Sequence, residues 1–447
     1  MEETNNIYKP LKEEWHLSKY NLFAKIPDKD QVGCVNLLRG SCSIITSEEF
    51  SKLQNGEITQ HFINQGYIIN YNETEALETL SRKSCSFSDV LNLTICPTMN
   101  CNFDCSYCFE KHRAGKISKE TQNLIINFVR KFVSNAKIKK IRITWFGGEP
   151  LLAMDIIESL SIKLIEVANE WKINYSADIV TNGYLLTQEI ADKFFELGIN
   201  SCQITLDGID NTHNKTRHLV NNGPTFDKII DNLKNIKFKC QINIRHNVYA
   251  DNTKEIEPLK KLVEKIAKES GNKLYYYPAF TNDADSAVGR EKELNYLNME
   301  DFYCYEIDKK IQNLTPYKPS YCGAQTLNFI VVDELGNLYN CWEDLGRIDN
   351  SFGRIERWDI ANPIATASNP QITINYINTG GATKDKECLD CVWLPLCQGG
   401  CPHRRLFYNK VCISCKNKPE DFVLKYIAFH QKQAEQMRKN REKSNKN

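Results

Sequence analysis

Residues 101–108 read CNFDCSYC, and this segment decides how the rest of the chain is interpreted. Cys101, Cys105 and Cys108 follow the spacing C-x3-C-x2-C, which brings three thiolates into one short loop. Thiolates are soft ligands that select zinc, copper or iron–sulfur groups. A tetrahedral zinc site and an ordinary four-iron cluster each need four protein ligands, and this loop supplies three. The spacing therefore predicts an iron–sulfur centre with one iron left open to a small molecule, with a zinc knuckle or a redox CxxC as the alternatives.

The composition limits the class of protein. A chain of 447 residues exceeds one ordinary core, so two or three domains are expected. A hydrophobic content of 41% and a charged content of 25% are typical of globular proteins, and a net charge of +1 gives no case for a nucleic-acid or membrane partner. No apolar run is long enough to span a bilayer, and the N-terminus lacks the pattern of a secretory signal. We therefore expect a cytoplasmic protein.

The chain has 18 cysteines, and their distribution indicates metal rather than disulfides. Disulfide frameworks belong to small secreted domains, whereas clustered cysteines in a reducing compartment are typical of metal sites. Cys322 and Cys341 form a pair, and six more cysteines lie between Cys388 and Cys415. We expect most of the scattered ones to be inert buried side chains. They are Cys34, Cys42, Cys85, Cys96, Cys202, Cys240 and Cys304.

Strand and helix patterns alternate over residues 89–300, which predicts an α/β fold with a parallel sheet. About six such units are too few to close an eight-fold barrel, and we expect the chemistry on the loops at the carboxyl ends of the strands. Residues 1–88 predict a small α+β module with a hairpin around RGS and a helix capped by Ser47. The remaining segments are a connector at 301–316, a Cys-rich domain at 317–418, and a helix with a basic tail at 419–447.

A second motif follows the strand IRITWF one βα unit after the cysteine loop. It reads Gly147-Gly148-Glu149-Pro150. Two glycines let the backbone approach a ligand closely, and a carboxylate beside them can accept hydrogen bonds from an ammonium group.

The cysteine loop, with Tyr107 just before its last cysteine, and the GGEP motif together resemble the radical S-adenosylmethionine (SAM) enzymes. The resemblance implies a partial (β/α)6 TIM-like barrel and a [4Fe-4S] cluster whose open iron is chelated by the amino and carboxylate groups of SAM. It also implies that GGEP meets the amino group of SAM. Further SAM contacts are implied at Tyr107 of the cysteine loop and at or after the strand ends, where hydrogen bonds that merely fix loops are an equally open role. The positions at or after strand ends are Thr181, Asn182, Thr205, Asp207, Arg217 and Asn247.

The C-terminal cysteines resemble the SPASM domain, which holds two auxiliary four-iron clusters in peptide-maturing radical SAM enzymes. Cys322, Gly336 and Cys341 fit C-x(9–15)-G-x4-C, and the next cysteines fit C-x2-C-x5-C-x3-C. The resemblance implies three [4Fe-4S] clusters in total, with two zinc sites as the alternative. Auxiliary cluster I takes Cys322, Cys341 and Cys401; auxiliary cluster II takes Cys388, Cys391, Cys397 and either Cys412 or Cys415, of which Cys412 is preferred.

Two departures from the family pattern bear on function. Members with a complete cluster I supply two cysteines before the glycine, and here Cys322 alone stands there. Either Cys304 is the further ligand, or an iron stays open and can bind a substrate thiolate. Sulfatase-maturing relatives carry an Asp base directly after the next cysteine, where this chain has Trp342, which cannot accept a proton. Glu343 is the candidate catalytic residue in its place.

These features predict an enzyme that generates a 5′-deoxyadenosyl radical to modify a ribosomally synthesised precursor peptide. The expected partners are a Cys-containing peptide and an electron donor such as flavodoxin or ferredoxin. The expected product is a thioether between a Cys sulfur and a carbon, with a carbon–carbon cross-link, formylglycine formation in a sulfatase and a zinc-binding scaffold as alternatives. The N-terminal module resembles leader-peptide binding domains of winged-helix type, and a structural cap on the barrel is its other interpretation.

Overall fold

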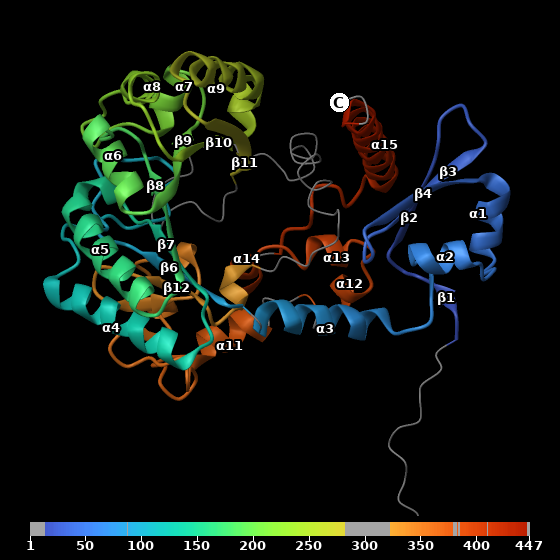
Figure 1. The fold of residues 1–447 in the computed structure, drawn as a ribbon, viewed down its shortest axis with the longest axis horizontal. Coiled ribbons are helices and arrows are strands. Elements are labelled where there is room, and N and C mark those ends of the chain that lie inside the picture. Colours follow the sequence, from blue (N-terminus) through green and yellow to red (C-terminus); the bar gives the residue numbers. More distant parts are fainter. Residues whose placement is uncertain are drawn as a thin grey trace, which may run out of the picture.

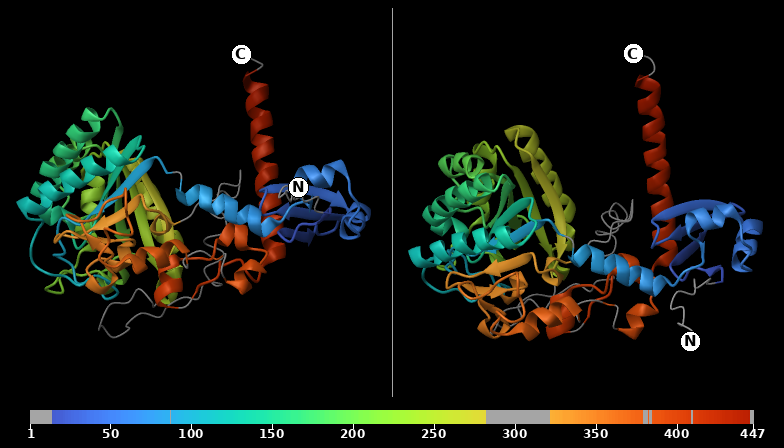
Figure 2. Two further views of the ribbon diagram at one scale, coloured as in Figure 1. Left: turned by 90° about the horizontal axis from the view of Figure 1, so that it is seen from below. Right: turned by 60° about the horizontal axis from the view of Figure 1, so that its bottom comes forward.

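The computed structural model describes residues 14–86, 88–281, 322–378, 382, 385–408 and 410–444. A large α/β lobe and a smaller lobe lie side by side, and helix α3 (Glu73–Ser86) runs between them (Figure 1 and Figure 2). The predicted connector at 301–316 and Cys304 lie outside the described residues. Among the helices described, none combines the length and the apolar character needed to cross a membrane.

A nine-stranded sheet forms the large lobe. Strands β6 to β11 are parallel and follow one another across the sheet in chain order, which is the arrangement of a (β/α)6 barrel. The prediction of a partial parallel barrel is therefore confirmed. The strands are β6 (Val90–Ile95), β7 (Lys140–Trp145), β8 (Asn174–Thr181), β9 (Ile199–Leu206), β10 (Gln241–Val248) and β11 (Leu274–Phe280).

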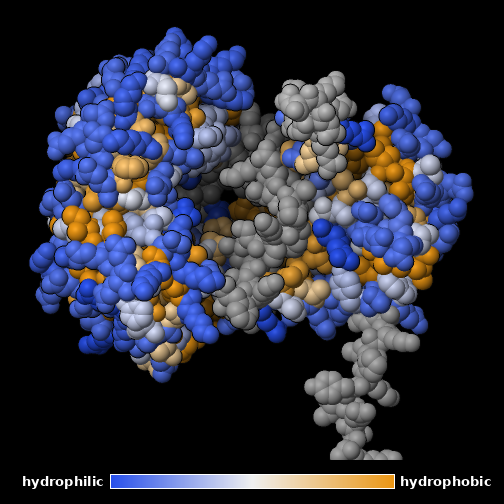
Figure 3. All heavy atoms as spheres, in the orientation of Figure 1, coloured by the Kyte–Doolittle hydropathy of each residue, from blue (hydrophilic) through white to orange (hydrophobic). Residues whose placement is uncertain are grey.

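Amphipathic helices cover the outer face of this barrel, and hydrophilic side chains dominate their visible surface (Figure 3). The first of them is capped by Ser118, whose hydroxyl accepts from the Thr121 amide at 3.0 Å. The principal helices are α4 (Lys119–Asn135), α5 (Met154–Glu170), α6 (Gln188–Glu196), α8 (Phe226–Asn235) and α9 (Ile256–Ser270). Short turns of helix lie at η1 (Pro150–Ala153), α7 (Asn211–Thr216) and η2 (Ala250–Glu255).

The C-terminal region continues the barrel sheet, which the sequence patterns did not predict. Strand β12 (Phe329–Val332) pairs in parallel with β6, the first strand of the barrel. Strands β13 (Asn337–Tyr339) and β14 (Gly353–Arg354) extend the sheet in antiparallel order. Short helical segments follow at η4 (Gly323–Gln325), η5 (Trp342–Asp344), η6 (Ile348–Asn350), α11 (Pro370–Asn378), α12 (Lys386–Leu389), α13 (Leu394–Cys397) and α14 (Pro402–Phe407).

The smaller lobe is built on the three-stranded antiparallel sheet β2–β3–β4. The predicted hairpin is β3–β4, but the helix after it is capped by Thr46 rather than Ser47. Thr46 has an extended backbone, and its hydroxyl accepts from the Glu49 amide at 3.1 Å. Ser47 is therefore the first residue of the helix and not its cap. The elements are β1 (His16–Leu17), β2 (Asn21–Lys25), β3 (Gln31–Asn36), β4 (Ser41–Thr46), α1 (Ser47–Gln54), α2 (Gln60–Gln65) and β5 (Ile68–Ile69).

The two ends of the chain share one hydrophobic core. Helix α15 (Pro419–Ser444) lies against β2 and β3, and the Tyr426 hydroxyl donates to the Gly40 carbonyl at 2.9 Å (Figure 1). Leu22 from the N-terminal sheet packs in the same buried cluster as Trp393 from the Cys-rich region. The smaller lobe therefore contains residues from both termini, although the sequence predicted two separate units.

Candidate active site and metal centres

A cavity of about 220 Å³ lies at the carboxyl ends of the barrel strands. Thr181, Thr205 and Asn247 stand at or near the ends of β8, β9 and β10 and face this space. Parallel strands end on the same edge of a barrel, and this shared edge is why residues far apart in sequence meet here. The other residues that line the cavity include Cys101, Cys105, Tyr107, Cys108, Gly147, Gly148, Asn182, Arg217, Arg245 and Glu343.

The loop after β6 brings the three cysteines of the first motif to one wall of the cavity. Backbone hydrogen bonds fix this loop against the segment after α7: the Asp104 amide donates to the His218 carbonyl at 2.9 Å, and the Ser106 amide to the Thr216 carbonyl at 3.0 Å. Burial raises the pKa of the Cys101 thiol, so it carries a proton until a metal displaces it. Three thiols on one wall of a cavity fit an iron–sulfur group with one iron facing the open space.

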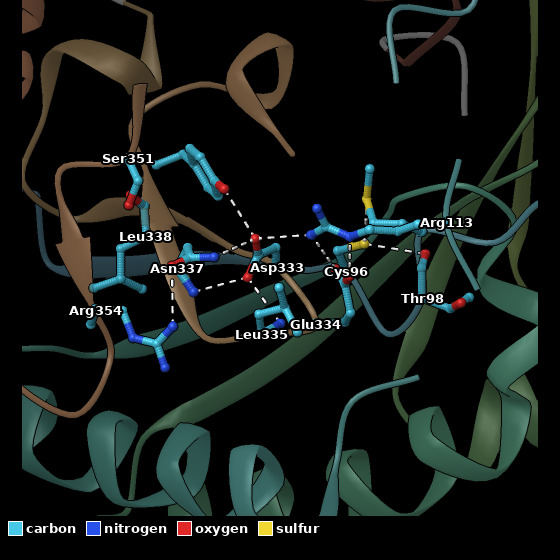
Figure 4. A network of polar contacts seen from close by, with 12 residues as sticks. Cys96, Thr98, Arg113, Asp333, Glu334, Leu335, Asn337, Leu338, Ser351 and Arg354 are labelled. Atoms are coloured by element: carbon cyan, nitrogen blue, oxygen red, sulfur yellow. Dashed lines mark hydrogen bonds and ion pairs between the residues drawn. The ribbon is translucent and has the colours of Figure 1, made fainter. Parts of the chain in front are cut away.

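Arg113, at the end of the cysteine loop, ties it to the turn between β12 and β13 (Figure 4). Its guanidinium pairs with Glu334 and lies 3.3 Å from the buried carboxylate of Asp333. Asp333 also accepts from the side chains of Asn337 and Tyr339, at 2.9 and 3.0 Å. The Cys-rich region thus supports the cysteine loop through a buried carboxylate that is fully hydrogen-bonded.

The two glycines of GGEP pass directly beneath the cysteine loop. A Cβ at Gly148 would lie 2.3 Å from the Asn100 carbonyl oxygen, and Gly147 has a φ of +116°. Both positions therefore need glycine, one for close backbone approach and one for conformation. Gly147 and Gly148 line the cavity.

Glu149 and Pro150 are buried beside the cavity instead of lining it. The Glu149 carboxylate accepts from the Thr181 hydroxyl at 2.6 Å and from the Asn182 amide at 2.7 Å. It also accepts from the Leu151 amide at 3.0 Å. These contacts join the ends of β7 and β8, so in this structure Glu149 fixes the residues that line the cavity.

Tyr107, within the cysteine loop, links that loop to residues after β9 and near the end of β10. Its hydroxyl donates to Asp207 at 2.9 Å and accepts from Arg217 and from Asn247, each at 2.9 Å. Asp207 is fully buried and also accepts from the Thr216 hydroxyl at 2.7 Å. The Nε of Arg217 is buried with no hydrogen-bond partner among the described residues. An unsatisfied guanidinium donor on a cavity wall fits an anionic ligand group such as the carboxylate of an amino acid.

Several cavity residues were missed by sequence reasoning. The most informative is Glu110, two residues after the last cysteine of the loop. Burial, with Glu343 and Glu334 as further causes, raises its pKa to about 8, and its Oε2 has no hydrogen-bond partner among the described residues. Its position next to the motif was a usable signal. The others are Phe103, Phe109, His112, Phe146, Val180, Gln203, Thr281 and Trp342.

The three cysteines assigned to auxiliary cluster I come together at the starts of three short helices. Cys322 precedes η4, Cys341 precedes η5 and Cys401 precedes α14. Burial raises the pKa of Cys322, and the nearby Cys401 raises it further. Burial likewise raises the pKa of Cys341, with Asp344 and Cys322 among the further causes. Cys322 thus interacts electrostatically with both Cys341 and Cys401, although no three such side chains among the described residues stand close enough to hold a single metal ion.

Four cysteines of the last motif line a second, smaller cavity between α12, α13 and the segment before α15. They are Cys388, Cys391, Cys397 and Cys412. Cys415, the competing candidate, does not line this cavity and is fully buried among apolar side chains. Four thiols around one space match the four corners of a cluster, and the grouping favours Cys412 over Cys415.

Residues 95–264 match the profile of the Radical SAM superfamily. The cysteine-type anaerobic sulfatase-maturating enzyme of Clostridium novyi (strain NT) is 25% identical over 341 residues, which span 70% of this chain and 87% of that protein.

Two solved structures share the fold. The anSMEcpe structure with bound AdoMet and Cp18Cys peptide has a TM-score of 0.56 at 21% identity, over 76% of this chain and 97% of that chain. Streptococcus suis SuiB bound to S-adenosylmethionine has a TM-score of 0.51 at 17% identity, over 89% of this chain and 99% of that chain.

Proposed function

The chain is a radical SAM enzyme, and from this premise we propose that it modifies a ribosomally synthesised peptide by forming a thioether between a Cys sulfur and a carbon. The observation that carries the proposal is the cavity in which Cys101, Arg217 and Glu343 meet, because one space then holds a metal loop, an anion-binding group and a carboxylate base. The anSMEcpe structure with bound AdoMet and Cp18Cys peptide shares the fold, and this likeness supports a peptide as the substrate.

Radical SAM enzymes bind a [4Fe-4S] cluster and SAM, which together supply a 5′-deoxyadenosyl radical that abstracts a hydrogen atom from the substrate. The residues of this chain bind and orient. We assign the cluster to Cys101, Cys105 and Cys108, and the carboxylate of SAM to the unsatisfied donor of Arg217. Asn182 and Asn247 line the same cavity, where their side-chain amides also donate to Asn102 at 2.8 Å and to Tyr107 at 2.9 Å. Aromatic walls exclude water, which protects a radical from side reactions.

Glu343 is the proposed base that takes the thiol proton when the substrate sulfur closes onto the substrate carbon radical, and the electron released in that step would pass to an auxiliary iron–sulfur group. Trp342, which precedes it, forms a wall: its indole N–H donates to the Thr94 hydroxyl at 2.8 Å and its ring stacks on Phe146 at 4.8 Å between centroids. Glu343 lines the cavity, and Glu110 lies close enough to feel its charge. The same carboxylate could serve formylglycine formation, which makes sulfatase maturation the second candidate.

Peptide reconstitution tests the reaction. We expect a Cys-containing peptide encoded beside this gene to yield, with SAM and dithionite, a product lighter by two hydrogen atoms in the mass spectrum. A product that has lost sulfur would establish formylglycine formation instead. Unchanged mass would contradict cross-linking and favour epimerisation.

Replacement of the base separates radical generation from bond formation. We expect Glu343→Gln to keep 5′-deoxyadenosine formation and to lower the cross-linked product about a hundredfold, because general bases contribute about that much. Glu356→Gln is the matched control, since Glu356 pairs with Arg354 on the surface at 2.9 Å. Equal loss in the two variants, or full product from Glu343→Gln, would remove Glu343 from the mechanism.

Iron analysis tests the proposed cluster count. Three four-iron clusters predict about twelve irons and twelve sulfides per chain, with a brown protein, whereas zinc sites predict a colourless one. We expect Cys412→Ala to retain about eight irons and Cys415→Ala to retain about twelve, because Cys412 shares a cavity with three other cysteines and Cys415 lies in the apolar core. The reverse pattern would exchange the two assignments.

A further inference from the structure

Two cationic side chains donate hydrogen bonds to the four-cysteine cavity of the C-terminal region. The guanidinium of Arg405 lies with Nη2 3.3 Å and Nη1 3.7 Å from the Cys388 sulfur. The ammonium of Lys416 lies 3.4 Å from the Cys412 sulfur. Arg405 comes from α14 and Lys416 from the turn before α15, so separate parts of the chain place a cation on two of the four thiols.

The position of Arg405 is built into the fold. Its side chain is 6% exposed, and it also donates to Asp385 at 2.9 Å. Burying a guanidinium costs free energy unless its N–H groups are hydrogen-bonded. Here the N–H groups of Arg405 that do not bind Asp385 donate to the Cys388 sulfur. The contact between Arg405 and the Cys388 sulfur therefore lies in the packed interior of the C-terminal region.

Positive charge exceeds negative charge around this cavity. Asp385 is shared by Arg405 and Lys410, with Lys410 Nζ at 3.0 Å. Glu387 is shared by Lys410 and Lys416, at 2.5 and 3.3 Å. Three cations thus meet two carboxylates, which leaves one positive charge in excess beside the cavity, and Arg405 and Lys416 are the two cations that reach the thiols.

The surroundings of the other auxiliary group are different. The groups that perturb Cys341 include the carboxylates of Asp344 and Glu343, and Asp344 is fully buried. Its Oδ2 accepts from the Tyr376 hydroxyl at 2.5 Å. Buried negative charge disfavours a further electron nearby, whereas buried positive charge favours it.

We propose that Arg405 and Lys416 raise the reduction potential of the iron–sulfur group held by Cys388, Cys391, Cys397 and Cys412 above that of the group at Cys322, Cys341 and Cys401. The inference rests on the cluster assignment made under the proposed function. Reduction adds one electron to the group and breaks no bond in the chain, so the added negative charge is stabilised by cations that donate to its thiolates. This makes the four-cysteine group the one that is reduced first and keeps the electron.

Potentiometric titration with dithionite, followed by electron paramagnetic resonance of the anaerobically reconstituted full chain, tests the proposal. We expect Arg405→Gln to weaken reduction of one auxiliary group at least tenfold, which is about 59 mV for a one-electron couple. We expect Lys416→Gln to lower the reduction potential of the same group. Arg405→Lys keeps the positive charge, so its reduction potential should stay close to that of the wild-type chain. Lys410→Gln is the matched control, because Lys410 pairs with the same carboxylates, and we expect it to shift the potential by less than half as much.

Iron content measured on the same samples distinguishes a failure of this inference from a failure of the cluster assignment on which it rests. A wild-type chain with about four irons would remove the auxiliary groups and with them the proposed cluster assignment. About twelve irons with unchanged potentials in both Arg405→Gln and Lys416→Gln would overturn the inference while leaving that assignment in place. If Arg405→Gln fails to fold, Lys416→Gln decides alone, since Lys416 is partly exposed and its loss leaves the core intact.

Discussion

We expect Cys101→Ala, Cys105→Ala and Cys108→Ala each to abolish SAM cleavage, measured as 5′-deoxyadenosine formed in the presence of dithionite. Each thiol lines the same wall of the cavity, and a three-ligand loop has no spare donor with which to hold the metal group. The loop itself stays anchored, because its backbone hydrogen bonds to His218 and Thr216 do not involve the sulfurs. The expected defect is therefore loss of one cluster with retained fold, visible as about four fewer irons per chain.

Cys240→Ala is the matched control for these variants. Cys240 belongs to the buried core of the same barrel and does not line the cavity. We expect this change to cost about 1 kcal/mol of stability and to leave SAM cleavage unchanged. Retained 5′-deoxyadenosine production in any of the three loop variants would refute the assignment of the radical site.

Gly148→Ala is expected to have an equally large effect for a different reason. The new Cβ would lie 2.3 Å from the Asn100 carbonyl oxygen and 2.7 Å from the Met99 carbonyl oxygen, both of which are backbone atoms just before Cys101. Backbone cannot swing aside as a flexible side chain can, so the cysteine loop must move. We expect a loss of about 3 kcal/mol in the free energy of unfolding and loss of SAM cleavage.

Gly353→Ala provides the comparison. A Cβ there meets its nearest atom at 3.6 Å, which is ordinary contact, so stability and SAM cleavage should stay near their original values. Thermal unfolding, iron content and 5′-deoxyadenosine formation measured on both variants distinguish the two outcomes. A Gly148→Ala protein with full iron content and full activity would show that the close approach of the two backbones is dispensable.

The features predicted correctly from the sequence were those written in short, local patterns. Cys101, Cys105 and Cys108 lie within eight residues, so their spacing alone predicted a metal loop with one open position. Gly147 and Gly148 followed a recognisable strand, and regular alternation of strands and helices predicted the parallel barrel. Such features are local because periodicity and ligand spacing are written into neighbouring residues.

Other parts of the site could not be predicted because they depend on contacts between distant segments. The pKa of Glu110 is raised by burial and further by Glu343, more than two hundred residues away, and the guanidinium of Arg405 donates to the sulfur of Cys388. The choice between Cys412 and Cys415 likewise needed the fold, since spacing allows both and burial separates them. The spacing of the cysteines along the sequence does not determine which of the two side chains faces the cavity.

The amino-acid sequence by itself determined that this chain is a parallel α/β barrel with a three-thiolate loop and a Cys-rich C-terminal region. Only the tertiary structure decided that β12 joins the barrel sheet beside β6 and that α15 closes the core of the N-terminal sheet. The physical reason is that hydrogen bonding and apolar burial between segments hundreds of residues apart depend on which surfaces remain uncovered after the local elements form. Those uncovered surfaces are a property of the assembled molecule and leave no short-range pattern in the chain.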